Sequence, residues 1–119
     1  MKPKLFLDTN VMLDLLGERE PFYEPIAKLA TLVDAGEIEF AVSSLSYATV
    51  HYLLTKFENR KKAIEKLRKF RALSSIIGVD ETIIDKGLNA GFSDFEDSLQ
   101  YFCALKGNCQ VLSSGSELN

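Results

Sequence analysis

The hydrophobic positions along the chain fall into four short runs separated by longer stretches with helical spacing. The runs are KLFL at 4–7, EIEFAVS at 37–43, SSIIGV at 74–79 and CQVLS at 109–113. Three of them lack a strict alternation of apolar and polar residues, which is typical of strands that are covered on both faces. The runs therefore predict four short strands of a sheet that has a layer packed on each side.

Between the runs, apolar residues recur three or four positions apart, as they do on one face of a helix. One helix is expected to start just after Asp8. Because strands alternate with helices, the chain is predicted to be a three-layer α/β/α domain with a mainly parallel central sheet of four or five strands. The other expected helices cover residues 21–35, 44–57, 60–73, 80–91 and 93–107.

The same spacing predicts which residues of two helices face the core. In the stretch 44–57 these are Leu45, Ala48, Tyr52 and Leu53. In the stretch 60–73 they are Ala63, Ile64, Leu67 and Phe70.

Composition limits the general class of the protein. The 119 residues, 46% apolar and 26% charged, suit a single domain over 1–119 with a substantial core. The formal net charge of −3 means that binding to nucleic acid needs a local basic patch or metal ions. Cys103, Cys109 and the single histidine, His51, cannot form a zinc site or a disulfide framework. Without a signal peptide or an apolar run of about 18 residues, the chain is predicted to be soluble and cytoplasmic, with no membrane partner.

Acidic residues occur at two places that should meet at one edge of the sheet. Asp8 directly follows the first predicted strand, and ligands of open parallel sheets bind beyond the carboxyl ends of the strands. Asp94, Glu96 and Asp97 open the helix expected at 93–107. Carboxylates are preferred ligands of Mg²⁺ and Mn²⁺, which activate water and stabilise phosphoryl transfer. We therefore predict that Asp8, Asp94 and Asp97 belong to a carboxylate cluster that binds divalent metal.

Some of these acids also have a structural explanation. A carboxylate at the end of a strand can accept backbone N–H bonds in the following turn, which applies to Asp8. Ser93 and Glu96 have the spacing of a capping box, so Glu96 is expected to cap its helix or to face solvent. Asp14 is expected to face solvent as well, or to order the acidic pocket from its edge.

The segments LFLDTNVMLDLL at 5–16 and DFEDSLQYFCALKGNCQVL at 94–112 resemble the PIN-domain family, the metal-dependent ribonuclease fold of VapC-type toxins. The resemblance covers residues 4–112 and leaves 113–119 as an irregular tail. It implies that Asp8 and Asp97 are the catalytic acids and bind Mg²⁺ or Mn²⁺. It also implies that Asp94 lies one turn before Asp97 and that Asn10 supports the first turn. It further implies an endoribonuclease that cleaves single-stranded RNA by metal-activated water, as the toxin of a toxin–antitoxin pair.

Two positions depart from the family pattern. Many members carry a glutamate on the helix after the second strand, and Thr49 stands at about that place here. The family often has T-R-N or T-R-D after the last matched strand, whereas this chain has LSSGSELN, with Ser114 and Ser116 in place of an acid or amide. The C-terminus is thus expected to be shortened or altered. These departures leave open a second function, a catalytically impaired module that binds an antitoxin or another protein, or forms a homodimer.

Seven basic residues lie between Arg60 and Arg71. Among them Lys62, Lys66 and Lys69 are candidate contacts to an RNA backbone. The same pattern is also typical of the solvated face of an amphipathic helix, in which the lysine stems cover apolar surface.

A third function is a domain that accepts a phosphoryl group on Asp8. Phosphatases of that kind need a second acid two residues later, and Asn10 occupies that position. This hypothesis is therefore the weakest of the three.

Overall fold

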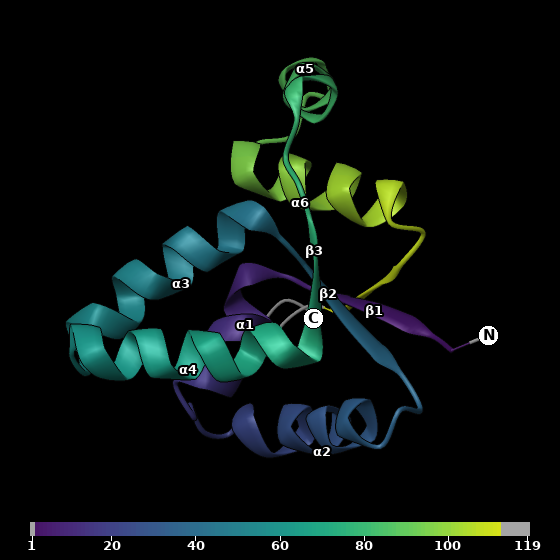
Figure 1. The fold of residues 1–119 in the computed structure, drawn as a ribbon. Coiled ribbons are helices and arrows are strands. Elements are labelled where there is room, and N and C mark those ends of the chain that lie inside the picture. The colour runs from purple at the N-terminus through teal and green to yellow at the C-terminus, as the bar shows by residue number, and fades with distance from the viewer. Residues whose placement is uncertain (1, 113–119) are drawn as a thin grey trace.

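The computed structural model describes residues 2–112 of the chain. Its four strands are β1 (Lys4–Leu7), β2 (Glu39–Ser43), β3 (Ser74–Ile77) and β4 (Gln110–Leu112). They form one parallel sheet in the order β3-β2-β1-β4 (Figure 1). The predicted α/β class and parallel sheet are confirmed. The predicted irregular tail at 113–119, including Ser114 and Ser116, lies outside the described residues.

Six helices connect or flank these strands in the described part of the chain. Every bound that was predicted for a helix or strand lies within two residues of the observed one. The helices are α1 (Thr9–Leu16), α2 (Tyr23–Asp34), α3 (Ser44–Phe57), α4 (Arg60–Leu73), α5 (Glu81–Asn89) and α6 (Phe95–Lys106).

The helices form a layer on each face of the sheet. The chain moves from β1 to β2 to β3 through α1–α4, and then returns past β1 to β4 through α5 and α6. Because crossovers between parallel strands are right-handed, connections that run in opposite directions lie on opposite faces. Figure 1 shows α5 and α6 on one side of the sheet and α2 and α4 on the other.

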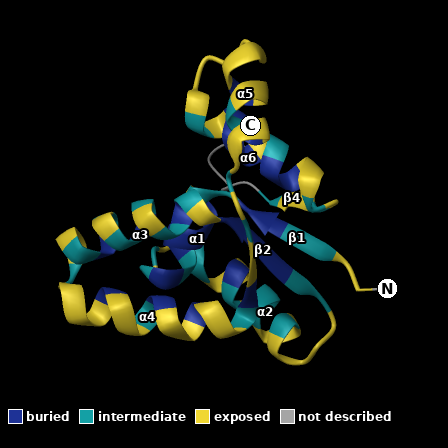
Figure 2. Cartoon of the chain, turned by 45° about the horizontal axis from the view of Figure 1, so that its top comes forward, coloured by how far each residue is buried: buried dark blue, intermediate teal, exposed yellow. Residues whose placement is uncertain are grey.

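Alternate residues of the inner strands supply two separate hydrophobic cores. Leu7, Phe40 and Val42 pack with α1–α4, whereas Phe6 and Ala41 pack with α5 and α6. Both faces of β1 and β2 are therefore covered, and Figure 2 shows their buried residues at the centre of the molecule. This double coverage explains why the sequence of the strands does not alternate strictly.

The cysteines belong to the α5–α6 side of the sheet and are not linked to each other. Cys103 is buried in the core there, and Cys109 packs at its margin. Burial raises the pKa of both thiols, so both are protonated at neutral pH.

The prediction of the buried face of α3 holds for two of its four residues: Leu45 and Leu53 pack against the cores, whereas Ala48 and Tyr52 are exposed. The buried residues are Ser46, Val50 and Leu54, whereas Tyr52 is 58% exposed. Apolar side chains occur around most of this helix, so their spacing does not identify one face. The face turned inward contains the hydroxyl of Ser46, which finds hydrogen-bond partners in the interior.

The prediction for α4 holds for three of its four residues. Ala63, Leu67 and Phe70 are buried, and Ile64 is exposed.

Among residues 2–112, no helix combines the length and the apolar character that a membrane crossing requires.

The strand order explains where a ligand can bind. β1 has β2 on one side and β4 on the other, and the direction of the connections reverses at this strand. Crevices in open parallel sheets form at the carboxyl end of such a strand. Asp8 is the residue that follows β1 at that end.

Candidate active site

A pocket of about 190 Å³ lies at the carboxyl end of β1 and contains all the acids that the sequence pointed to. The start of α1, the middle of α3 and the start of α6 contribute to it. None of its described lining residues is a lysine, an arginine or a histidine. These lining residues are Asp8, Thr9, Asn10, Thr49, Leu53, Asp94, Glu96, Asp97 and Gln100.

Asp8 is held in place by the helix that it starts. It is the N-cap of α1, and its Oδ1 accepts a hydrogen bond of 2.8 Å from the backbone N–H of Val11. Its own N–H donates to the carbonyl of Leu112, 3.3 Å away, which ties the site to β4. The capping explanation for Asp8 is thus confirmed, and it fixes this half-buried carboxylate beside the pocket.

Asp94 plays the same part at the start of α6. Its Oδ1 accepts a hydrogen bond of 3.1 Å from the backbone N–H of Asp97. The predicted capping box of Ser93 and Glu96 is therefore wrong. Because Asp94 is the N-cap, Glu96 stands at the second helical position, and its side chain reaches across the pocket instead.

The hydroxyl of Thr9 is the centre of a hydrogen-bond network that joins three helices. It donates to Glu96 Oε2 at 3.1 Å and accepts from the side-chain amide of Gln100. It also lies 2.8 Å from the hydroxyl of Ser46, which accepts from Gln100 at 3.3 Å. Since the single proton of Thr9 goes to Glu96, the proton between Thr9 and Ser46 comes from Ser46. A hydroxyl has one donor and two acceptor sites, so Thr9 uses all of them.

We name this group of residues the Thr9 network (Thr9, Ser46, Glu96 and Gln100). Its members come from three segments that are far apart in the sequence, and no motif groups all four. Glu96 and Gln100 are four residues apart, so they share a face of α6. That spacing was the one available signal, and it does not identify Thr9 or Ser46. The partners of Thr9 lie 37, 87 and 91 residues away along the chain.

The chemistry of the pocket suits a hard divalent cation. Its donors are carboxylate, amide and hydroxyl oxygens, which Mg²⁺ and Mn²⁺ prefer. In the observed side-chain positions, no three His, Cys, Asp or Glu residues among 2–112 converge as a ligand group. Mg²⁺ commonly keeps several waters and uses only one or two carboxylates, so the donor set fits such an ion. The role of Asp8, Asp94 and Asp97 as ligands stays a prediction.

The expectation that Asp14 faces solvent is wrong. The residue is 1% exposed, and its Oδ1 accepts a hydrogen bond of 2.8 Å from Nε of Arg19. The guanidinium of Arg19 also forms an ion pair with it. Asp14 is thus a structural acid and does not line the pocket.

The basic helix α4 lies at the far end of α1 from Asp8. Lys66 Nζ donates to the carbonyl of Leu16 at 2.8 Å and pairs with Glu58 at 2.8 Å. The eight residues of α1 separate that end from Asp8 by about 12 Å. Lys62 and Lys69 are exposed. The contact of these three lysines with RNA stays a prediction. Lys66 already stabilises the fold through its contacts with Leu16 and Glu58.

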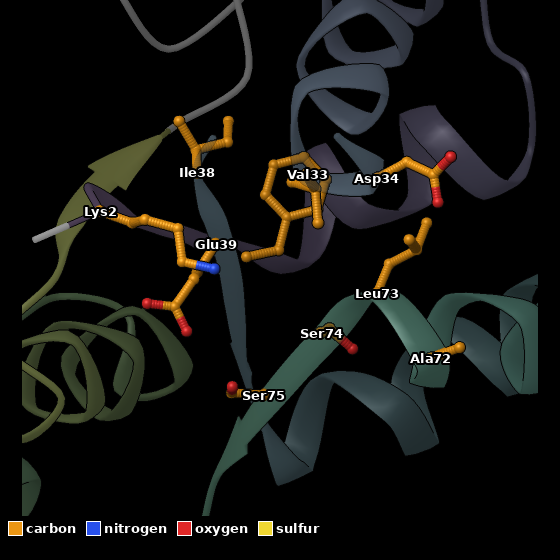
Figure 3. Close-up of a pocket in the computed structure, with 10 residues that line it drawn as sticks. Lys2, Val33, Asp34, Ile38, Glu39, Ala72, Leu73, Ser74 and Ser75 are labelled. Carbon is orange, nitrogen blue, oxygen red and sulfur yellow. The ribbon is translucent and has the colours of Figure 1, made fainter. Parts of the chain in front are cut away.

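A larger cavity of about 320 Å³ lies at the opposite edge, where β2 and β3 begin. Lys2, Asp34 and Glu39 are its charged lining residues. Figure 3 shows Asp34 and Glu39 on different sides of this cavity, with carboxylates that do not turn toward each other. The cavity therefore lacks the gathered acids of the smaller pocket.

Comparison with known proteins agrees with this architecture. The family model of the PIN domain matches residues 4–115, nearly the whole chain. The chain belongs to the PIN domain family. It is also 28% identical to Ribonuclease VapC1 of Aquifex aeolicus, over 96% of this chain and 82% of that protein.

Two solved structures share the fold at low sequence identity. VapC20 of Mycobacterium tuberculosis, a sarcin–ricin loop cleaving toxin, matches with a TM-score of 0.73 and 12% identity, over 95% of this chain and 91% of that one. VapBC2 of Rickettsia felis, solved with a DNA fragment from its promoter, matches with a TM-score of 0.66 and 18% identity, over 91% and 84%. These structures support the three-layer fold.

Proposed function

We propose that this chain is a metal-dependent endoribonuclease that cleaves single-stranded RNA at the pocket beyond β1. The observation that carries the proposal is the meeting of Asp8 with Asp94 and Asp97 in one pocket whose described lining residues include no basic side chain. Membership of the PIN domain family and similarity to Ribonuclease VapC1 support it.

In this proposal the residues of the chain prepare the site for the metal. Asp8 and Asp97 hold a Mg²⁺ or Mn²⁺ ion, Asp94 supports them from one turn earlier, and Asn10 supports the turn after β1. The bound ion supplies positive charge and an activated water for attack on the phosphodiester. The backbone N–H groups of Val11 and Asp97 keep the carboxylates of Asp8 and Asp94 at the pocket.

The charge of the pocket sets an order of binding. Several carboxylates repel an RNA phosphate, and a divalent cation removes that repulsion. RNA is therefore expected to enter the site only when metal is present. Basic residues elsewhere, such as Lys62 and Lys69, would strengthen RNA binding without acting at the pocket.

We further infer that the protein is the toxin of a toxin–antitoxin pair, with an antitoxin protein as its partner. The inference is supported by the resemblance to VapC20, which is a toxin, and to VapBC2. Cytoplasmic RNA is the substrate class that this role requires.

A second candidate function is a module with impaired catalysis that binds a protein partner or a second copy of itself. One observation favours it, because Thr49 lines the pocket where an acid is expected on α3. A protein that dimerises without metal and does not bind Mn²⁺ would have this second function.

The test is cleavage of a labelled single-stranded RNA by the full chain with Mn²⁺. Asp97→Asn is expected to lower the cleavage rate at least about 100-fold, because it removes a charge that holds the metal. Asp85→Asn, an exposed acid on α5, is the matched control and is expected to cleave like the wild type. Equal rates in Asp97→Asn and the wild type would refute the assignment.

A further inference from the structure

The pocket lacks an acid on α3 but has an additional one on α6. Thr49 and Glu96 line the same pocket from these two helices. Glu96 is half-buried, and no described lysine or arginine forms an ion pair with it. Its charge is therefore unlike that of Asp14, which has Arg19 as its counterion.

The Thr9 network fixes where the carboxylate of Glu96 points. Glu96 Oε2 accepts the only proton of Thr9, whose two acceptor sites are filled by Ser46 and Gln100. Thr9 cannot turn away without breaking contacts to α3 and α6. A carboxylate can accept about four hydrogen bonds or metal contacts, and Thr9 uses one of them. The remaining acceptor sites are available to the pocket.

Gln100 provides a second, independent sign of a ligand. It lines the pocket, is 8% exposed, and donates through Nε2 to Thr9 and Ser46. Its Oε1 is buried and has no hydrogen-bond partner among the described residues. An unsatisfied buried acceptor costs about 1–3 kcal/mol. A donor that reaches this oxygen from the side of the pocket, which Gln100 lines, would satisfy it, and a water bound to a cation is such a donor.

We propose that Glu96 is a metal-site carboxylate of this chain and replaces, from α6, the acid that α3 lacks at Thr49. Thr9 and Gln100 are its positioning residues. This inference rests on the proposed function to the extent that the pocket binds a divalent cation, and it names a ligand that the family pattern does not.

The test is a calorimetric titration of the purified full chain with Mn²⁺ alone. Glu96→Gln keeps an acceptor for Thr9 but loses the charge, and it is expected to bind Mn²⁺ about tenfold or more weakly. Glu81→Gln is the matched control, because Glu81 is an exposed glutamate in the first turn of α5. It is expected to bind like the wild type.

The double variant Thr49→Glu with Glu96→Gln tests the replacement itself. A carboxylate restored on α3 is expected to return the Mn²⁺ affinity to within about threefold of the wild type, as a site with the same number of charged ligands. Thermal unfolding without metal checks that each variant is folded.

The outcomes separate this inference from the proposed function. Wild-type affinity in Glu96→Gln, together with loss in Asp97→Asn, would overturn the role of Glu96 and leave the proposed function intact. A loss in Glu96→Gln that Thr49→Glu does not restore would overturn the replacement. Failure of the wild type to bind Mn²⁺ would overturn both proposals.

Discussion

Helix α1 carries an acid near each end, and the two acids have opposite surroundings. Asp8 caps the start of the helix and lines a pocket with Asp94, Glu96 and Asp97. Asp14, near the end, is buried and paired with Arg19, a residue of the following loop. The first acid lies beside other acids around an open space, and the second lies beside a base in the interior.

Under the proposed function, this difference separates an acid that binds metal from an acid that stabilises the fold. The chain itself supplies the counterion of Asp14, which contacts Oδ1, while the buried Oδ2 has no hydrogen-bond partner among the described residues. At the pocket, the described lining supplies further acids and no base, so the charge there suits a cation from solution. The two ends of one helix can therefore be tested against each other.

Removing Arg19, the counterion of Asp14 near the end of α1, is expected to give the largest loss of stability. Arg19→Ala leaves the carboxylate of Asp14 buried without its counterion, and we expect the free energy of unfolding to fall by about 3 kcal/mol. Urea denaturation measures this change. Arg68→Ala, an exposed site on α4, is the control and is expected to change stability by less than about 0.5 kcal/mol.

Mn²⁺ affinity of Arg19→Ala should equal that of the wild type, because Asp14 does not line the pocket. A folded Arg19→Ala protein with unchanged stability would contradict this prediction. It would show that the ion pair with Arg19 does not offset the cost of burying the carboxylate of Asp14.

A change in the packing of α5 against α6 is expected to lower stability less than the loss of Arg19 does. A methyl group on Gly87 would lie 2.9 Å from both the Leu99 and Ser98 side chains of α6. Gly87→Ala is therefore expected to lower the free energy of unfolding by about 1–2 kcal/mol, the cost of overpacking less the gain in helix propensity.

The control is Gly78→Ala, since a methyl group there meets no atom within 4 Å. Denaturation curves should show a loss for the first variant and almost none for the second. Equal stability of both variants would contradict the close packing of α5 on α6.

Asp80 is intermediate between Asp8 and Asp14, because it is exposed but has Lys106 as a counterion. Its substitution is expected to have the smallest effect on the free energy of unfolding. The backbone N–H of Ile83 and the Lys106 ammonium, 3.1 Å away, hold the pKa of Asp80 below its ordinary value of 3.8. The unfolded chain therefore binds this proton at a higher pH than the native one. The stabilisation is complete above about pH 4 and is lost as the pH falls through the lower native pKa.

Asp80→Asn keeps a capping side chain but cannot titrate. Its stability difference from the wild type is expected to shrink between pH 6 and pH 3 in denaturation experiments. A difference that does not change over this range would show that the Lys106 contact leaves the titration of Asp80 unaffected.

The sequence was sufficient to predict the elements and to place Asp8, Asp94 and Asp97 at one edge of the sheet. The strand runs are short and apolar, and apolar residues recur at helical spacing between them, so the bounds of both are determined mainly by local pattern. On α3 that spacing did not identify the buried face. Asp8 could be placed at the pocket because it directly follows β1, and Asp97 because α6 had to begin at the same edge of the sheet.

What the sequence did not reveal depends on contacts between distant residues. Thr9 meets Ser46, Glu96 and Gln100 only because α1, α3 and α6 converge. Asp14 is buried because Arg19, after the end of α1, turns back to it. From local pattern alone, Asp14 was predicted to face solvent and Glu96 to cap its helix or to face solvent.

The most direct test of the central claim is a calorimetric Mn²⁺ titration of the wild type and of Asp8→Asn. Asparagine caps a helix as well as aspartate does, so the variant is expected to keep its fold and lose only the charge. We expect saturable binding to the wild type and at least about tenfold weaker binding to the variant. Equal affinities, or no binding to the wild type, would contradict the assignment of the pocket as a metal centre.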